Sequence, residues 1–171
     1  MKICLIDTET TGTNPYRHEL IEIGFIVFNT DDPDEIFECN MKVKPEHIDR
    51  ADPQALLVNG FREEDWADAK DLKEALTFLQ VRAYGAIFMA YNVTFDWNFI
   101  DVAFKRYKLQ SPFNYHKICV MSMAWLKLPH LKSISLKSVC AELGLPVEDD
   151  IHRALHGAQR AFAVYKKLLT I

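Results

Sequence analysis

Two acidic residues, Asp7 and Glu9, follow a short apolar run at residues 1–6. That run is typical of a buried strand, and alternate side chains of a strand point to the same side. Both carboxylates should therefore project from one face, where they repel each other and are costly to bury without a partner. Alone, two acids so spaced would suit a solvated strand end. A divalent cation is the other solution, because Mg²⁺ and Mn²⁺ prefer oxygen ligands.

The residues that follow, Thr10, Thr11 and Gly12, favour the metal site. Small hydroxylated side chains and a glycine let the backbone come close to a ligand. The hexapeptide 7–12 resembles the first motif of the DEDD superfamily of 3′–5′ exonucleases. That superfamily includes the proofreading subunits and domains of DNA polymerases, such as bacterial DNA polymerase III, and trimming RNases. The resemblance implies two more acids further along the chain and, in one branch, a histidine.

A second segment, Tyr91 to Asp96, follows an apolar run at residues 86–90 and opens a predicted helix. An acid at a helix start also compensates the helix dipole, a contribution of about 0.3–1 kcal/mol. However, Asn92, Phe95 and Asp96 resemble the second motif of the family. The resemblance makes Asp96 the third metal-binding acid, with Asn92 and Phe95 shaping the site. Tyr91 stands where the family often has histidine, which we interpret as tolerated variation.

A third segment begins at His152 and resembles the family pattern H-x-A-x-x-D-A, except that Gly157 stands at the position of the fourth acid. Glycine inside a helix costs about 1 kcal/mol relative to alanine. Gly157 therefore indicates either the close approach of a neighbouring element or the loss of a metal-binding side chain, and we favour the loss.

Other acids and bases nearby are poor substitutes for the missing carboxylate. Asp149 and Asp150 precede the predicted last helix, so we expect them to be badly placed. His156 is adjacent to Gly157, but imidazole suits Mg²⁺ less well than a carboxylate does.

The resemblance implies hydrolysis with two bound cations, which such sites hold about 3.5–4 Å apart. One cation activates water and the other stabilises the leaving oxygen. Mg²⁺ or Mn²⁺ would be held by Asp7, Glu9 and Asp96, with one metal weakened by Gly157. His152 would take the proton from the attacking water, because imidazole titrates near neutral pH. The catalytic residues would then be His152 and Glu9, and the terminal nucleotide would be received by Thr10, Thr11, Gly12, Asn92 and Phe95.

Further candidates for nucleic-acid contact are aromatic and basic. Phe95 and Tyr16 could stack on bases, a contact worth about 1–3 kcal/mol per base. Burial in the core explains Phe95 more simply. Lys127, Lys132 and Lys137 lie in a stretch free of acids and could meet phosphates, although a solvated face explains them equally well.

The remaining pattern predicts one α/β domain over residues 1–171. Strands are expected at 20–28 and 37–43, which with the first strand make an antiparallel three-strand meander, and at 86–90. Helices are expected at 53–59, 72–83, 95–107, 120–126, 136–143 and 153–169. This order implies a mixed central sheet with helices on both faces. The resemblance to the exonuclease family implies the ribonuclease H-like fold.

Composition sets limits on partners and location. The net charge is −4 and the pI about 5.9, which argues against gripping long nucleic acid on a basic surface. It does not argue against an enzyme that takes a chain end into an acidic, metal-filled pocket. The four cysteines are far apart, so we expect buried free thiols in a reducing compartment. With no apolar run of membrane-spanning length and no leader pattern, we expect a cytoplasmic protein.

Three functions are open at this point. The first is a 3′–5′ exonuclease of the histidine-containing DEDD branch, acting on single-stranded or frayed 3′ ends of DNA, with RNA as the alternative substrate. The second is an inactive domain that binds nucleic-acid ends or a DNA polymerase partner. The third is a metalloenzyme that degrades very small oligonucleotides.

Overall fold

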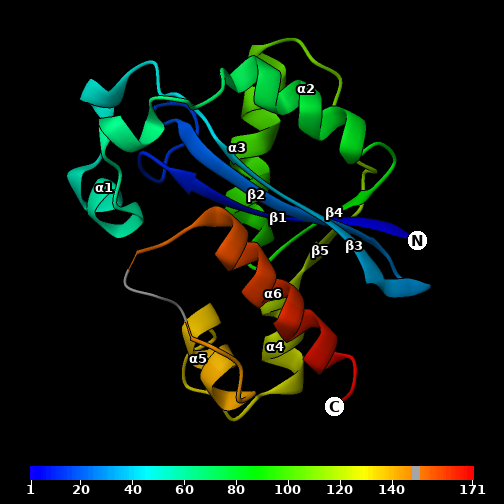
Figure 1. The fold of residues 1–171 in the computed structure, drawn as a ribbon. Helices are drawn as coiled ribbons and strands as arrows, with labels where there is room; N and C mark the ends of the chain where they lie inside the picture. Colours follow the sequence, from blue (N-terminus) through cyan, green and yellow to red (C-terminus); the bar gives the residue numbers. More distant parts are fainter. Residues whose placement is uncertain (148–150) are drawn as a thin grey trace.

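A five-stranded mixed sheet forms the centre of the protein (Figure 1). A computed structural model describes residues 1–147 and 151–171. The strands run in the order β3-β2-β1-β4-β5. β1 pairs antiparallel with β2 and parallel with β4, β2 pairs antiparallel with β3, and β4 pairs parallel with β5. Their bounds are β1 Lys2–Thr10, β2 Leu20–Asn29, β3 Asp32–Lys42, β4 Ile87–Ala90 and β5 Lys117–Cys119. The predicted meander is confirmed.

Helices cover both faces of this sheet, as predicted. α2 and α3 pack on one face, α4, α5 and α6 lie on the other, and α1 stands beyond one end of the sheet (Figure 1). The helices are α1 Pro53–Asn59, α2 Leu72–Arg82, α3 Val93–Arg106, α4 Val120–Lys127, α5 Leu136–Glu142 and α6 Ala154–Leu168, with short 3₁₀ turns at Ile48–Arg50 and Glu63–Trp66.

The alternation of β1 builds two hydrophobic cores. Cys4 and Ile6 face the core under α2 and α3, whereas Ile3 and Leu5 face the core under α4, α5 and α6. All four side chains are fully buried. In sequence, a central strand that is buried on both faces appears as a continuous apolar run. β1 therefore carries Asp7 and Glu9 on a strand that is paired on both sides and buried on both faces.

The structure differs from the sequence prediction at several positions. β3 begins at Asp32 rather than at Phe37, because β3 is an edge strand and tolerates Pro33. The strand β5 was not predicted, since three residues carry too little periodicity. The predicted burial of the cysteines is right for Cys4 and Cys140 and wrong for Cys39 and Cys119, which are half-buried; all four are free thiols.

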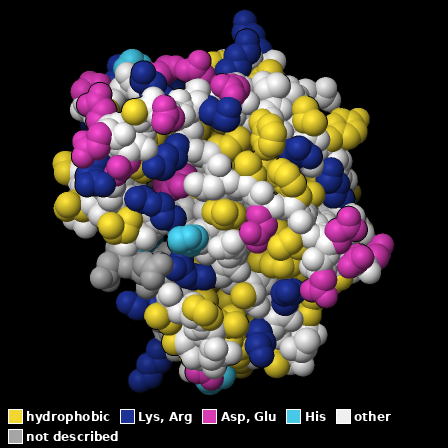
Figure 2. Space-filling model, viewed as in Figure 1, with side chains coloured by type: hydrophobic (Ala, Val, Ile, Leu, Met, Phe, Trp, Pro, Cys, Tyr) yellow, Lys and Arg dark blue, Asp and Glu magenta, His cyan; other side chains and the backbone are white. Residues whose placement is uncertain are grey.

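The surface view over α6 and β3 shows mixed charge. Lys and Arg side chains are interspersed there with acidic and apolar ones (Figure 2). Across the described residues, no helix combines the length and apolar character that a membrane crossing needs.

Helix α6 approaches β2 so closely that main chain meets main chain at Gly24. A Cβ atom at Gly24 would lie 2.2 Å from the carbonyl carbon of Ala154 and 2.2 Å from the amide nitrogen of Leu155. Gly24 is also the cross-strand partner of Asp7. The glycine thus seats the beginning of α6 beside the acids of β1.

We predict that Gly24→Ala destabilises the protein by about 3 kcal/mol or more, because overpacking against backbone cannot be relieved by a side-chain rotation. Urea unfolding measures the change. Gly85→Ala is the control: that glycine has φ +74° and no neighbour within 4 Å, so only backbone strain of about 1–2 kcal/mol is expected. If both substitutions lowered the free energy of unfolding equally, α6 would be able to move away from β2 at little cost.

Candidate active site

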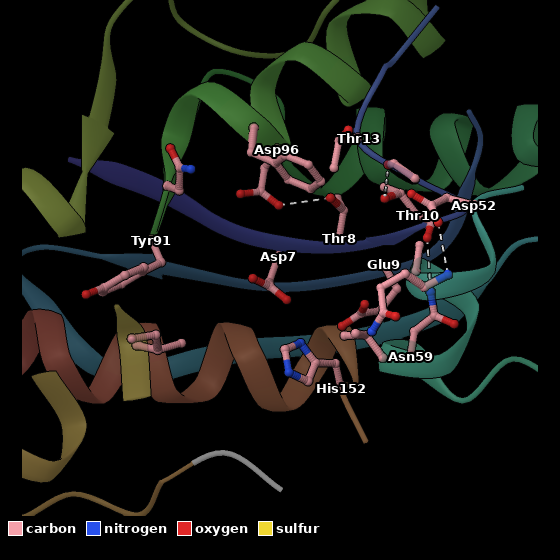
Figure 3. A pocket seen from close by; sticks show the side chains of 17 residues that line it. Asp7, Thr8, Glu9, Thr10, Thr13, Asp52, Asn59, Tyr91, Asp96 and His152 are labelled. Carbon is pink, nitrogen blue, oxygen red and sulfur yellow. Dashed lines mark hydrogen bonds between the residues drawn. The ribbon is translucent and has the colours of Figure 1, made fainter. Parts of the chain in front are cut away.

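A cavity of about 450 Å³ opens at the carboxyl end of β1, where the first acidic motif lies. It is walled by the end of β1 and the loop after it, by α1, by the starts of α3 and α5, and by the segment before α6 (Figure 3). The lining residues are Asp7, Thr8, Glu9, Thr10, Gly12, Thr13, Asp52, Gln54, Ala55, Val58, Asn59, Tyr91, Asn92, Phe95, Asp96, Leu136 and His152. Segments nearly 150 residues apart in sequence therefore meet in one hollow.

Asp7 and Glu9 both line this cavity, as the strand alternation predicts. In β1 they pair with Gly24 and Glu22 of β2. Asp7 points toward the space between the sheet and the start of α6 (Figure 3). Glu9 is more enclosed and lies toward α1 (Figure 3). The two carboxylates thus reach the same cavity from one strand.

Asp96 enters the cavity from the first turn of α3 and is buried. The Thr8 hydroxyl donates a hydrogen bond of 2.9 Å to Asp96 Oδ1 (Figure 3). Burial raises the pKa of Asp96 to about 7, and the hydrogen bonds from Thr8 oppose that rise. A bound cation would favour the ionised form, so this acid is suited to metal binding and is disfavoured as a free carboxylate.

We predict that Asp96→Asn raises the free energy of unfolding of the metal-free protein more at pH 8 than at pH 5. The difference between the two pH values should be roughly 2–3 kcal/mol. The sign follows from the raised pKa of Asp96. The folded state holds this proton more tightly than the unfolded chain, so stability falls as pH rises from about 4 to about 7.

Urea unfolding in the presence of a chelator checks this pH dependence. Asp101→Asn on the same helix is the control, because Asp101 pairs with Lys105 near the surface. If Asp96→Asn changed the free energy of unfolding equally at pH 5 and pH 8, burial would not raise the pKa of Asp96.

His152 and the two residues of the second motif reach the same cavity. The amide of His152 donates a hydrogen bond of 3.0 Å to the carbonyl of Val58, which fixes the segment that enters α6. Phe95 is half-buried and packs against Phe99 at a ring-centroid distance of 5.1 Å, while another part of its surface lines the cavity. Asn92 precedes α3, and its side chain makes no capping bond to the helix.

The predicted substrate-binding segment divides in two. Thr10 and Gly12 line the cavity, whereas Thr11 does not. The Thr11 hydroxyl accepts a hydrogen bond from the amide of Glu19, and its carbonyl accepts one from the amide of Asp52. The hydroxyl and the carbonyl of Thr11 thus link the end of β1 to Glu19 and Asp52, and its contact with substrate stays a prediction.

Gly157 lies on the side of α6 that faces Asp7. A Cβ atom there would be 2.3 Å from Asp7 Oδ2 and within 4 Å of two further atoms of the same carboxylate. The neighbour is the mobile end of a side chain, not backbone as at Gly24. Main-chain packing therefore does not require glycine at position 157, and a side chain there would point at the predicted metal-binding acid.

His156, the neighbour of Gly157 in sequence, does not line the cavity. His156 is exposed and lines a separate surface hollow with Arg160 and Pro146. Asp149 and Asp150, which we expected to be badly placed, lie outside the described residues.

The additional candidates for nucleic-acid contact lie outside the cavity wall. Tyr16 is exposed, and Lys127 donates a hydrogen bond to the carbonyl of Ile171. Lys132 and Lys137 are exposed, and Lys137 follows Leu136, which lines the cavity. Their contact with phosphates stays a prediction.

Sequence reasoning predicted α1 as a helix but missed its place in the cavity wall, and it missed Glu22. The residues that α1 and its N-cap contribute to the wall are Asp52, Gln54, Ala55, Val58 and Asn59. Glu22 is fully buried in β2, where it accepts hydrogen bonds from Asn40 Nδ2 at 2.6 Å and from the amide of Ala154 at 3.4 Å. The available signal was an acid inside an apolar strand, on the face that also carries Gly24.

The donors in this cavity suit a hard divalent cation in kind but are incomplete in number. Asp7, Glu9 and Asp96 supply oxygen, which Mg²⁺ and Mn²⁺ prefer. Among the residues that the structure describes, no three His, Cys, Asp or Glu side chains form a ready metal-holding cluster. The arrangement fits a cation that draws the carboxylates together when it binds, and the loss of a fourth ligand at Gly157 stays a prediction.

The mixed sheet with helices on both faces has the ribonuclease H-like architecture, and its cavity brings acidic side chains together. The sequence profile of the exonuclease family RNase_T matches residues 4–165. The chain therefore belongs to the exonuclease family.

Curated relatives and solved structures agree with this assignment. The chain is 32% identical to DNA polymerase III subunit epsilon of Pasteurella multocida over 90% of its own length and 61% of that protein. It is 28% identical to the 3′–5′ DNA exonuclease Cap18 of Escherichia coli, over 90% of this chain and 84% of Cap18. E. coli Exonuclease I in complex with a dT13 oligonucleotide matches with a TM-score of 0.81 and 16% identity, over 99% of this chain and 41% of that one. The chain thus spans about three-fifths of the first of these relatives.

Proposed function

We propose that this chain removes nucleoside monophosphates from the 3′ ends of nucleic acid by metal-dependent hydrolysis. The observation that carries the proposal is the meeting of Asp7, Glu9, Asp96 and His152 in one cavity. These residues come from β1, α3 and the segment before α6. Their meeting in one cavity is not expected by chance, because these segments are far apart in the sequence. The family membership of the chain supports the same reaction.

Each of the four residues has a separate task in this proposal. Asp7, Glu9 and Asp96 would hold Mg²⁺ or Mn²⁺, which when bound polarises the phosphate and lowers the pKa of water. His152 accepts the proton from the attacking water, and its segment is fixed by the bond to Val58. Glu9 is also proposed as a catalytic residue, and it reaches the cavity on the side nearer α1.

The shape of the cavity supports release of one nucleotide at a time. A volume of about 450 Å³ falls within the range of small-ligand pockets. α1 stands across one side of it, and the chain beyond Thr10 closes another. Phe95, Val58 and Leu136 offer apolar surface to a base and its sugar, while Thr10 and Gly12 offer polar backbone. A terminal nucleotide suits this volume better than an internal segment of a strand.

The substrate in this proposal is single-stranded or frayed DNA. The names of two relatives support DNA, since they are described as a DNA polymerase subunit and a DNA exonuclease, and a structural neighbour was solved with dT13. The name ribonuclease T of other relatives keeps RNA as the alternative substrate. A DNA polymerase partner is supported only by the name of the epsilon subunit. The four free cysteines support a reducing, cytoplasmic setting.

The direct test is release of nucleotides from a 3′-labelled single strand in Mn²⁺, with EDTA as the metal-free control. We expect slow release of mononucleotides that EDTA abolishes. A matched RNA and a series of lengths from two to thirty nucleotides define the substrate. Product that appears first as internal fragments would contradict the proposal.

A second function has its own supporting observation. With Gly157 at the fourth acid position and no ready cluster of three ligands in the described chain, the protein could bind 3′ ends without cutting them. Fluorescence anisotropy with a 3′-hydroxyl and a 3′-phosphate strand separates the two functions. Selective binding of the 3′-hydroxyl without cleavage in Mn²⁺ supports the binding domain.

A further inference from the structure

Arg153 occupies a position that is unfavourable for the helix it begins. It is the N-cap residue of α6, where the positive end of the helix dipole disfavours a cation. Its side chain also provides no capping bond, since a guanidinium has no acceptor. The residue is nevertheless half-buried rather than turned out into solvent. An arginine in this place therefore needs another explanation.

The guanidinium of Arg153 joins two carbonyl groups of separate segments. Arg153 Nη1 donates to the carbonyl of Asn59 at 2.5 Å and to the carbonyl of His152 at 3.2 Å. Its Cζ lies 5.6 Å from the ring centroid of Trp66, within the range of a cation–π contact. Trp66 is itself buried and donates from Nε1 to the carbonyl of Ile21 at 2.8 Å. The charged group is therefore held on a fixed surface.

Asn59 continues this connection to the strand that carries the acids. Its buried side chain donates from Nδ2 to the carbonyl of Thr10 at 3.0 Å and accepts from the amide of Phe61 at 3.2 Å. The preceding carbonyl, of Val58, accepts the amide of His152. The end of α1 is thus bonded on one side to the residue after Glu9 and on the other to the His152 segment.

We propose that Arg153 and Asn59 are positioning residues that set the place of His152 relative to Glu9 across the cavity. We name the pair the α1 bracket. The proposal rests on the proposed exonuclease function for its catalytic consequence, but not for the bracket itself. Neither residue takes or gives a proton in the reaction. Both act through His152, since a catalytic group displaced by about 1 Å can lose on the order of 10²-fold in rate.

Arginine suits this task better than lysine because Nη1, which makes both bonds, donates in directions fixed by the guanidinium plane. Arg153→Lys keeps the positive charge but loses that planar geometry. Asn59→Ala removes the donor to Thr10 and leaves the backbone carbonyl in place. Arg82→Lys is the matched control, since Arg82 also stacks on an aromatic ring, that of Phe37 at 4.4 Å, and lies outside the cavity wall.

The first measurement is hydrogen exchange of the His152 amide by NMR in the metal-free protein. We expect exchange at least about 10-fold faster in Arg153→Lys and in Asn59→Ala, with the amide of Leu5 unchanged and with Arg82→Lys like the parent. Unchanged exchange at His152 in both bracket variants would overturn the proposal. So would equal acceleration at Leu5, which would signal general loosening of the fold.

The second measurement is steady-state cleavage in a Gly157→Asp background. We expect kcat to fall about 10-fold with KM within twofold. A rise in KM alone would mean that Arg153 binds phosphate, and this would overturn the positioning role. If no variant in this background cleaves at all, the proposed nuclease function fails, while the exchange result still decides the bracket.

Discussion

Gly157→Asp is expected to raise the Mn²⁺-dependent rate of nucleotide release by about 10²–10³-fold. The reason is that an aspartate at this position points at Asp7 and completes the set of oxygen ligands. A well-held cation stabilises the transition state by several kcal/mol, which corresponds to that range of rates. The new side chain meets only the carboxylate of Asp7, which rotates at little cost, so the variant should fold.

Gly157→Ala is the control for Gly157→Asp. Alanine gains about 1 kcal/mol of helix propensity but supplies no ligand. It should therefore leave the rate unchanged, while the apparent Mn²⁺ affinity, followed by calorimetry, rises only in the aspartate variant. If the parent is already fast and aspartate adds nothing, the assignment of Gly157 as a lost ligand is wrong.

His152→Gln, made in the Gly157→Asp background, is expected to lower kcat by about 10²–10⁴-fold, the usual contribution of a general base. Glutamine keeps the backbone bond to Val58 and a polar side chain, but it cannot accept a proton near neutral pH. Strand binding, measured by anisotropy, should change less than threefold.

The matched control for that histidine is His156→Gln. His156 lies four residues further along in the first turn of α6, is exposed and lines a different hollow. Its replacement should alter kcat by less than twofold. Equal losses at both histidines would point to a general effect on α6 and not to proton transfer at residue 152.

The sequence was informative where patterns are local. The alternation in β1 predicted that Asp7 and Glu9 share a face, and the run of helical spacing predicted α6 to within one residue at each end. Gly157 was detectable because it contradicts the propensity of the helix around it. Each of these features is set by residues that are close together in the sequence, so it can be predicted without knowing the fold.

The remainder depended on contacts that carry no local signature. The bond from Arg153 to the carbonyl of Asn59 joins residues 94 positions apart, and a carbonyl is present at every position of the chain. Thr11 was expected at the substrate, but it does not line the cavity, and its carbonyl accepts a hydrogen bond from the amide of Asp52. α1 could be predicted as a helix from Pro53 and Gly60, but its place beside the cavity could not.

The docking of α6 on β2 has a consequence for the protein while it is being synthesised. A nascent chain whose α6 is still inside the ribosome would already contain the acids of β1 and α3. It would lack the helix that packs on β2 at Gly24 and the segment that enters this helix. Domains generally fold as units during translation. The cavity should therefore become complete only after α6 has left the ribosome.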